Sequence, residues 1–153
     1  MLSPSVERAR GYRDTLRRHQ MDSPEERIVT RERVEESGDE AGYQAMQELL
    51  KLRNRPDAVY CYNDLTAIGA MQAARASGLS VPGDVAFVGT GNLRYDKYLR
   101  VPLTSVDQQP EVLGLRTGEL ALEIMGNPEM PSKAILLPPR LIVRQSSVDE
   151  TAG

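Results

Sequence analysis

The chain alternates between two hydrophobic periods, and this alternation most restricts its fold. Short continuous apolar runs, typical of buried strands, lie at residues 58–62 and 85–88, and residues 103–106 form another short expected strand. Segments with apolar residues at helical spacing separate these runs. Strands that alternate with helices of about 10 to 15 residues form a parallel sheet covered by helices. We therefore expect an α/β domain with an open, mostly parallel sheet and helices on both faces.

The first two expected helices begin at hydroxyl residues. Ser3 or Ser5 would cap the first, and Ser37 with Glu40 has the spacing of a capping box for the second. Between these helices, residues 28–30 form a short run of β-prone residues.

Turn-forming residues set the limits of the later elements. Asn63 would cap the third helix, which ends near Gly78, and Pro110 would open the fourth. Residues 134–143 are strand-like, although two consecutive prolines favour an edge or a break. The stripe of the fourth helix expected to be buried consists of Leu113, Leu120, Ala121 and Ile124.

Length and composition indicate one folded unit. A chain of 153 residues suits one compact domain or one lobe of a larger protein. We expect residues 1–145 to form that unit and residues 146–153 to be a polar tail. The net charge of −3 provides no basic footprint for nucleic acid.

The same sequence argues against a membrane or secreted protein. No apolar run approaches the roughly 20 residues of a membrane span, and residues 1–5 lack a secretory signal. Cys61 is the only cysteine, which excludes an intrachain disulfide and a cysteine-rich metal site. Flanked by tyrosines in a strand, it is interpreted as a small buried hydrophobe. These features predict a cytoplasmic protein.

The residues of common enzyme and cofactor sites do not assemble in this sequence. The single histidine, His19, lies near the end of an arginine-rich helix and is interpreted as solvated. Gly89 and Gly91 imitate the start of a dinucleotide fingerprint, but Arg94 stands where its third glycine would be. We therefore expect no enzyme, no metal and no cofactor.

Polar residues after the strands, together with one arginine, suggest binding instead. Ligands of open parallel sheets bind beyond the carboxyl ends of the strands, here at Asn63-Asp64, residues 89–92 and Asp107-Gln108. Arg8 lies near the start of the first helix, where a cation is unfavourable unless an anion or strong acceptor is present. Its planar donor fork suits sugar hydroxyls or carboxylates.

Five blocks of the sequence, in order, resemble the lactose-repressor/galactose-repressor family of bacterial transcription regulators. They cover nearly the whole chain. The blocks are residues 8–12 (RARGY), 55–70 (RPDAVYCYNDLTAIGA), 78–89 (GLSVPGDVAFVG), 102–108 (PLTSVDQ) and 137–147 (LPPRLIVRQSS).

The resemblance implies an effector-sensing role. Family members carry an N-terminal helix-turn-helix domain and a two-lobed effector domain similar to periplasmic sugar-binding proteins. This chain resembles the C-terminal lobe and the late segment that crosses back toward the first lobe. The DNA-binding domain, the first lobe and the strand before the Arg8 helix are not among its residues. Contact with DNA is therefore expected only through a separate N-terminal domain.

The resemblance also suggests ligand-binding residues. Arg8 matches the effector-binding arginine of the family, Asn63 matches a polar effector contact, and Gln108 lies where a crossover meets the cleft. Two alternatives stay open: Asn63 is a plain helix cap, and Gln108 makes a hydrogen bond within the linker.

The sequence departs from the family pattern at three positions. Thr90 and Gly91 stand where most members have an aromatic residue and a sugar-binding aspartate, and Ser37 stands where several place a stacking ring. Glycine offers only backbone groups to a hydroxyl. An ordinary hexose is therefore a poorer match, and Asn92 would take over part of the binding. Ser37 and Asn92 complete the set of candidate ligand-binding residues.

The family forms dimers through this lobe, and the resemblance implies a homodimer here. The candidate interface residues are Ile68, Met71, Tyr98 and Leu99. In the alternative, Ile68 and Met71 face the protein's own sheet.

Together these features predict the sensing domain of a transcription regulator, whose lobes close on a small polar, sugar-like effector. With half the cleft outside this chain, we expect weak or undetectable effector binding by the chain alone. The rival hypothesis is a solute-binding protein of a transporter. The sequence leaves open whether the sheet has an exposed edge at which chains pair.

Overall fold

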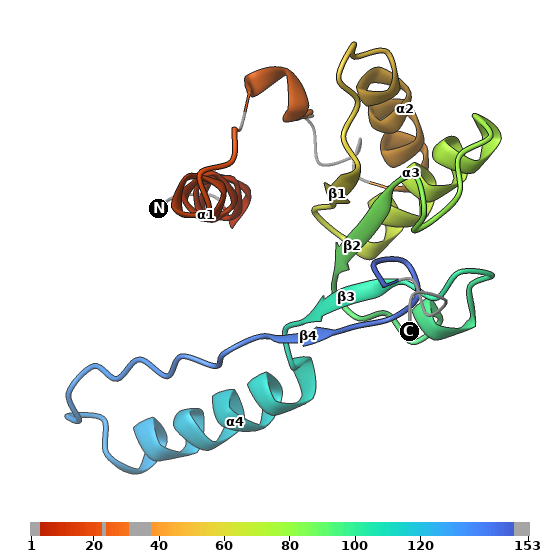
Figure 1. The fold of residues 1–153 in the computed structure, drawn as a ribbon. Coiled ribbons are helices and arrows are strands. Elements are labelled where there is room, and N and C mark those ends of the chain that lie inside the picture. The colour runs from red at the N-terminus through yellow and green to blue at the C-terminus, as the bar shows by residue number, and fades with distance from the viewer. Residues whose placement is uncertain (1–3, 23, 31–37, 149–153) are drawn as a thin grey trace.

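The computed structural model describes residues 4–22, 24–30 and 38–148. Its sheet contains β1 (Ala58–Tyr60), β2 (Ala86–Thr90), β3 (Thr104–Asp107) and β4 (Arg140–Ile142), hydrogen-bonded in that order. β1, β2 and β3 run parallel, and β4 is antiparallel to β3 (Figure 1). The expected α/β class with a mostly parallel sheet is confirmed.

The core lies where two helices pack on the first strands. α2 (Asp39–Leu50) and α3 (Asp64–Ala76) lie side by side, and α3 also contacts β2 (Figure 1). Phe87 of β2 is fully buried beside Met46 of α2 and Leu103, which precedes β3. Small residues dominate the inner face of α3. Those that are buried are Ala67, Gly69, Ala70, Ala73 and Ala74.

The predicted ends of the helices agree best with the structure where a capping or turn-forming residue determines them. Asn63 caps α3, Gly78 follows the helix with a φ of 81°, and Pro110 begins α4 (Pro110–Gly126). Cys61 is buried, as expected of a small hydrophobe, and burial raises the pKa of its thiol to about 12, with the charge of Asp64 adding to the effect.

The first third of the chain differs in part from the sequence-based expectations. Of the two candidate N-caps for α1 (Pro4–Arg18), Ser5 lies inside the helix and Ser3 is outside the described residues. α2 begins at Asp39 with Gly38 as N-cap, and Ser37 of the expected capping box lies outside the described residues. Residues 28–30 have no regular structure, because no strand of the described chain pairs with them.

The last third of the chain forms an arm, defined here as residues 110–139. Figure 1 shows α4 projecting from the sheet, with the extended segment that leads into β4 returning alongside it. The prediction of a buried stripe is wrong: Leu113, Ala121 and Ile124 are exposed, and Leu120 is only half-buried. Among the described residues no other element covers this helix face. Of residues 134–143 only three join the sheet, after the two prolines.

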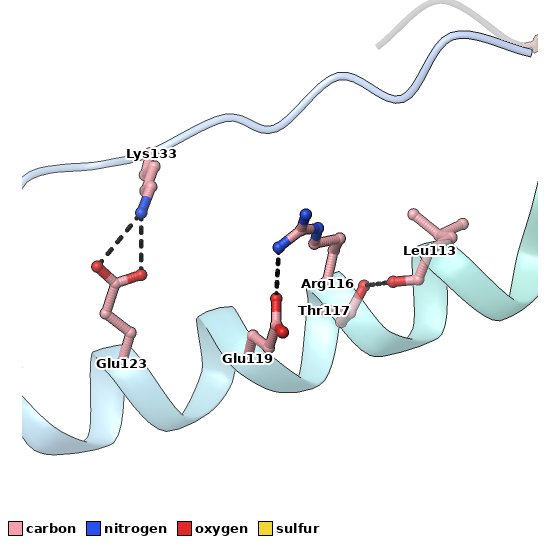
Figure 2. A network of polar contacts seen from close by, with 6 residues as sticks. All are labelled: Leu113, Arg116, Thr117, Glu119, Glu123 and Lys133. Carbon is pink, nitrogen blue, oxygen red and sulfur yellow. Dashed lines mark hydrogen bonds and ion pairs between the residues drawn. The ribbon is translucent and has the colours of Figure 1, made fainter.

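An exposed ion pair connects the two limbs of the arm: Lys133 Nζ lies 3.0 and 3.2 Å from the Glu123 carboxylate oxygens (Figure 2). A second pair, Arg116 with Glu119 at 2.9 Å, lies within α4. Exposed ion pairs of this kind contribute about 0 to 1 kcal/mol each. Large apolar side chains meanwhile stay uncovered, up to 92% exposure at Leu136. An apolar surface of this extent is typical of an interaction site.

Residues after β4 return to the body of the domain. Ser146, which begins the segment expected to be a polar tail, is fully buried. Its hydroxyl accepts from the Thr104 amide and donates to the Phe87 carbonyl, at 2.8 and 2.7 Å. No helix in the described ranges is both long and apolar enough to cross a membrane.

Candidate functional site

The polar residues singled out in the sequence follow neighbouring parallel strands. Asn63 comes after β1, Asn92 after β2 and Gln108 after β3. Because the three strands run in the same direction, their carboxyl ends form one edge of the sheet. We call this the carboxyl edge.

Arg8 of α1 reaches this edge through Tyr62. Its Nη1 donates to the Tyr62 carbonyl at 2.8 Å, and its guanidinium lies 4.8 Å from the centre of the Tyr62 ring. The carbonyl and the ring supply the acceptor that a cation needs near a helix start. The ring remains 46% exposed. Arg8 and Tyr62 therefore form a polar and aromatic surface directly beside Asn63.

Asn63 has a structural role in the folded chain. Its Oδ1 accepts from the Thr66 amide at 2.8 Å, which satisfies one free donor at the start of α3. The helix-cap interpretation is therefore confirmed, and effector contact through this residue stays a prediction.

Removing this cap has a measurable consequence. We expect Asn63→Ala to lower the free energy of unfolding by about 1 kcal/mol, because the first-turn amides lose their acceptor. Asn63→Ser retains a capping oxygen and should lie within a few tenths of a kcal/mol of the wild type. Urea denaturation monitored by circular dichroism measures both, and equal losses in the two variants would contradict the capping role.

Asn92 is held by a second arginine. Arg144, two residues after β4, donates through Nη2 to Asn92 Oδ1 at 2.6 Å and through Nη1 to the Leu103 carbonyl at 2.5 Å. The backbone N–H of Asn92 donates to Ser105 Oγ at 2.9 Å, and the φ of Asn92 is 55°. Sequence reasoning missed Arg144, whose only signal was a basic residue just after the last strand.

Asp64 lies beneath the loop that connects β2 to Asn92. Its fully buried carboxylate accepts from Ser105 Oγ at 2.6 Å and from the Leu93 amide at 3.0 Å. A Cβ on Gly89 would lie 2.2 Å from Asp64 Oδ1, and one on Gly91 would lie 3.0 Å from Oδ2. Gly91, whose φ is 133°, therefore fits a close packing position.

Two candidate ligand-binding residues remain, Gln108 and Ser37. Gln108 is exposed beyond β3, while its neighbour Gln109 donates through Nε2 to the Pro138 carbonyl at 2.6 Å. The hydrogen bond within the linker thus belongs to Gln109. Ser37 lies outside the described residues. Arg8 and Asn63 meet at Tyr62, whereas Asn92 and Gln108 are placed at the same edge by the strands they follow.

The candidate interface residues lie around a groove between α3 and residues 99–101. Ile68, Met71 and Leu99 line this groove of about 550 Å³, together with Arg75 and Arg100. Met71 also belongs to the buried core, and Ile68 packs partly against it. Tyr98 is 75% exposed, with Lys97 Nζ 4.9 Å from its ring centre. A role of this surface in dimerisation stays a prediction.

The open, mostly parallel sheet with helices packed on it has the architecture of a lobe of the periplasmic-binding-protein type. The model of the periplasmic binding protein-like domain matches residues 2–147. The chain belongs to this family, in the form found in the effector-binding domains of LacI-type transcription regulators.

Individual relatives agree with this assignment. The chain is 34% identical over 145 residues to the HTH-type transcriptional repressor PurR of Klebsiella pneumoniae, covering 93% of this chain and 40% of the repressor. A LacI-family regulatory protein from Chloroflexus aggregans has 35% identity and a TM-score of 0.83, covering 92% of this chain and 50% of that one. The regulator CelR, solved in complex with cellobiose, has 32% identity and a TM-score of 0.81, covering 93% and 42%.

These comparisons confirm the family named from the five sequence blocks. The relatives are transcription repressors and regulators, which agrees with the expectation that the chain is not an enzyme. The chain spans half or less of the length of each relative.

Proposed function

We propose that this chain senses a small polar effector on behalf of a DNA-binding transcription regulator. The observation that carries the proposal is the contact of Arg8 with the carbonyl and ring of Tyr62, the residue before Asn63, at the carboxyl edge. Ligands of open parallel sheets bind at this edge. The complex of CelR with cellobiose supports a sugar-like ligand class.

The chemistry of this edge further narrows the ligand. Arg8 uses one guanidinium nitrogen on Tyr62, and its other donors suit hydroxyl or carboxylate acceptors. The exposed Tyr62 ring suits the flat face of a sugar or base. Gly91 supplies no carboxylate. The ligand therefore carries hydrogen-bond acceptors toward Arg8 and a ring toward Tyr62.

The arm supports a role within a larger protein. Its uncovered apolar residues, including Leu115, Leu122, Met125 and Leu136, suit packing against a further lobe. The chain spans 40% of the PurR repressor of Klebsiella pneumoniae, which leaves length for such a lobe in a protein of that kind. A ligand that binds better between closed lobes would shift the protein toward closure by its difference in affinity. DNA contact would come from a domain outside these residues.

The groove beside α3 is the proposed surface for a second copy. Ile68 and Leu99 supply apolar contact there, and the exposed Tyr98 ring extends the surface. A symmetric pair would place two effector sites in one assembly.

Effector binding is tested by calorimetry on the longest reading frame that contains this chain, against a panel of sugars and nucleosides. We expect binding of one panel member, and an affinity loss of at least about tenfold in Arg8→Lys, because lysine lacks the planar donor fork. Arg18→Lys is the matched control, since Arg18 is an exposed arginine of the same helix. The chain of 153 residues should bind the same ligand weakly or undetectably.

Two results would contradict the proposal: no panel member binds the longer protein, or Arg8→Lys binds as tightly as the wild type. Micromolar binding by the 153-residue chain alone would contradict the need for a second lobe. The upstream coding sequence distinguishes the regulator from the rival hypothesis. An encoded helix-turn-helix supports the regulator, and an encoded secretory signal supports a solute-binding protein of a transporter.

A further inference from the structure

Two carboxyl groups are buried together at the start of α3. Asp64 is the first residue of that helix, and Asp96 is the first residue of the short 3-10 helix η3 (Asp96–Tyr98). Both side chains are 0% exposed. Two adjacent carboxylates without water would repel each other strongly, so a buried pair of this kind requires a neutralising group.

The two carboxyls differ in their partners. Asp64 accepts from the Ser105 hydroxyl and the Leu93 amide, both donors suited to a charged carboxylate. Among the described residues, neither oxygen of Asp96 has an N–H or O–H donor. A carboxyl group without donors is satisfied only when it carries a proton and donates it.

The acceptor for that proton is Asp64, because Leu93 joins the two residues: its N–H donates to the Asp64 carboxylate and its carbonyl accepts from Asp96 N–H, both at 3.0 Å. Burial, followed by the hydrogen bond to Asp64 and the charge of Asp64, raises the pKa of Asp96 to about 7. The charge of Arg144 and the nearby Leu93 N–H, which itself is hydrogen-bonded to Asp64, act in the opposite direction. Arg144 is hydrogen-bonded to Asn92 and Leu103, so it does not neutralise Asp96 directly.

Few other titratable groups face the pair. Tyr95, the neighbour of Asp96, has a raised pKa because of burial first and the charges of Asp96, Asp64 and Asp39 second. The described residues contain no cluster of three His, Cys, Asp or Glu side chains that could hold a metal ion. A proton is therefore the simplest group that satisfies both carboxyls.

We propose that Asp64 and Asp96 share one proton, and that this proton holds η3 against the start of α3 as a pH-sensitive contact. The backbone fixes the position of Asp96 between the two flanking loops, because Asp96 N–H donates to Leu93 O and its carbonyl accepts from Leu103 N–H, both at 3.0 Å. This inference does not depend on the proposed effector function.

The direction of the pH effect follows from the raised pKa. In the unfolded chain Asp96 loses its proton near its ordinary value of 3.8, whereas in the folded chain it keeps the proton up to about pH 7. The folded state thus binds more protons between these values, so stability falls as pH rises through this window. Above about pH 7 Asp96 is deprotonated in both the folded and the unfolded state, so its contribution to the free energy of unfolding no longer changes with pH.

The first test compares the wild type with Asp96→Asn between about pH 4 and pH 8. The asparagine amide donates to Asp64 at every pH, so the variant should lack this dependence. We expect the Tm of the wild type to fall relative to the variant by more than about 5 °C up to pH 7, and then to stay parallel. Asp57→Asn, at an exposed carboxyl, is the matched control and should run parallel to the wild type throughout.

The second test needs no variant. Carbon NMR of the side-chain carboxyls in the aspartate-labelled wild type should show one buried carboxyl with a midpoint near pH 7. Midpoints below about 4.5 for every aspartate would overturn the proposal.

A rise in Tm on adding calcium that Asp96→Asn abolishes would also overturn it, since the neutralising group would then be a cation.

Discussion

Replacing Gly69 by alanine is expected to destabilise the domain by about 3 kcal/mol or more. A Cβ at this position would lie 1.7 Å from the Asp39 carbonyl oxygen at the start of α2. Gly42 makes the reciprocal contact, since its Cβ would lie 2.0 Å from the Thr66 carbonyl oxygen. Both obstacles are backbone atoms, so the two helices would have to separate, and separation would open the core around Met46. Chemical denaturation measures the loss.

A second glycine in a helix supplies the control. Gly118 of α4 has no atom within 4 Å of a built Cβ, so alanine adds helix propensity without a clash. Gly118→Ala should therefore leave stability unchanged or raise it by up to about 1 kcal/mol. A Gly69→Ala variant as stable as the wild type would show that the helices do not pack as described.

Ser146→Ala is expected to cost about 2 to 4 kcal/mol, although it removes one oxygen atom. The hydroxyl joins two strands, accepting from the amide of Thr104 in β3 and donating to the carbonyl of Phe87 in β2. Alanine leaves both of these backbone groups buried without that partner. Thermal and urea unfolding should show the loss, with the sheet still formed at low temperature.

The matched control is Ser77→Ala at the end of α3, where the serine is exposed. Its change should stay within about 0.5 kcal/mol. If both variants lose the same small amount, the hydroxyl of Ser146 is not a structural link and its burial has no energetic role.

Local sequence chemistry predicted the elements that depend on neighbours in the chain. The apolar run at residues 85–88 leads into β2 and supplies its first three residues, and the cap at Asn63 depends on a donor three residues away. Long-range pairing was not readable in the same way. The run at residues 28–30 is β-prone, yet it has no strand to pair with in the described chain. Helical periodicity on α4 indicated an apolar face but not what covers it.

The same distinction between local and long-range information applies to the candidate site. Arg8 was predicted because a cation near a helix start needs an acceptor, but that the acceptor is Tyr62, 54 residues away, required the fold. The hydrogen bonds from Ser105 to Asp64 and from Arg144 to Leu103 each span 41 residues, and these side chains have an ordinary local context in the sequence. The departures at Thr90 and Gly91 were visible in the sequence. The packing of Gly91 against Asp64 was not.

The attachment of the arm at two adjacent strands has a mechanical consequence. The arm leaves the sheet after β3 and returns to it at β4, and these two strands pair antiparallel from Ser105 to Asp107. The base of the arm is therefore fixed to the sheet, whereas no other element of the described chain covers its far end. A helix of 17 residues is about 25 Å long. A twist of about 10° at the base would carry the tip through roughly 4 Å, enough to change which side chains interdigitate there. Small distortions of the sheet are thus amplified into a sweep at the distal end, as by a lever.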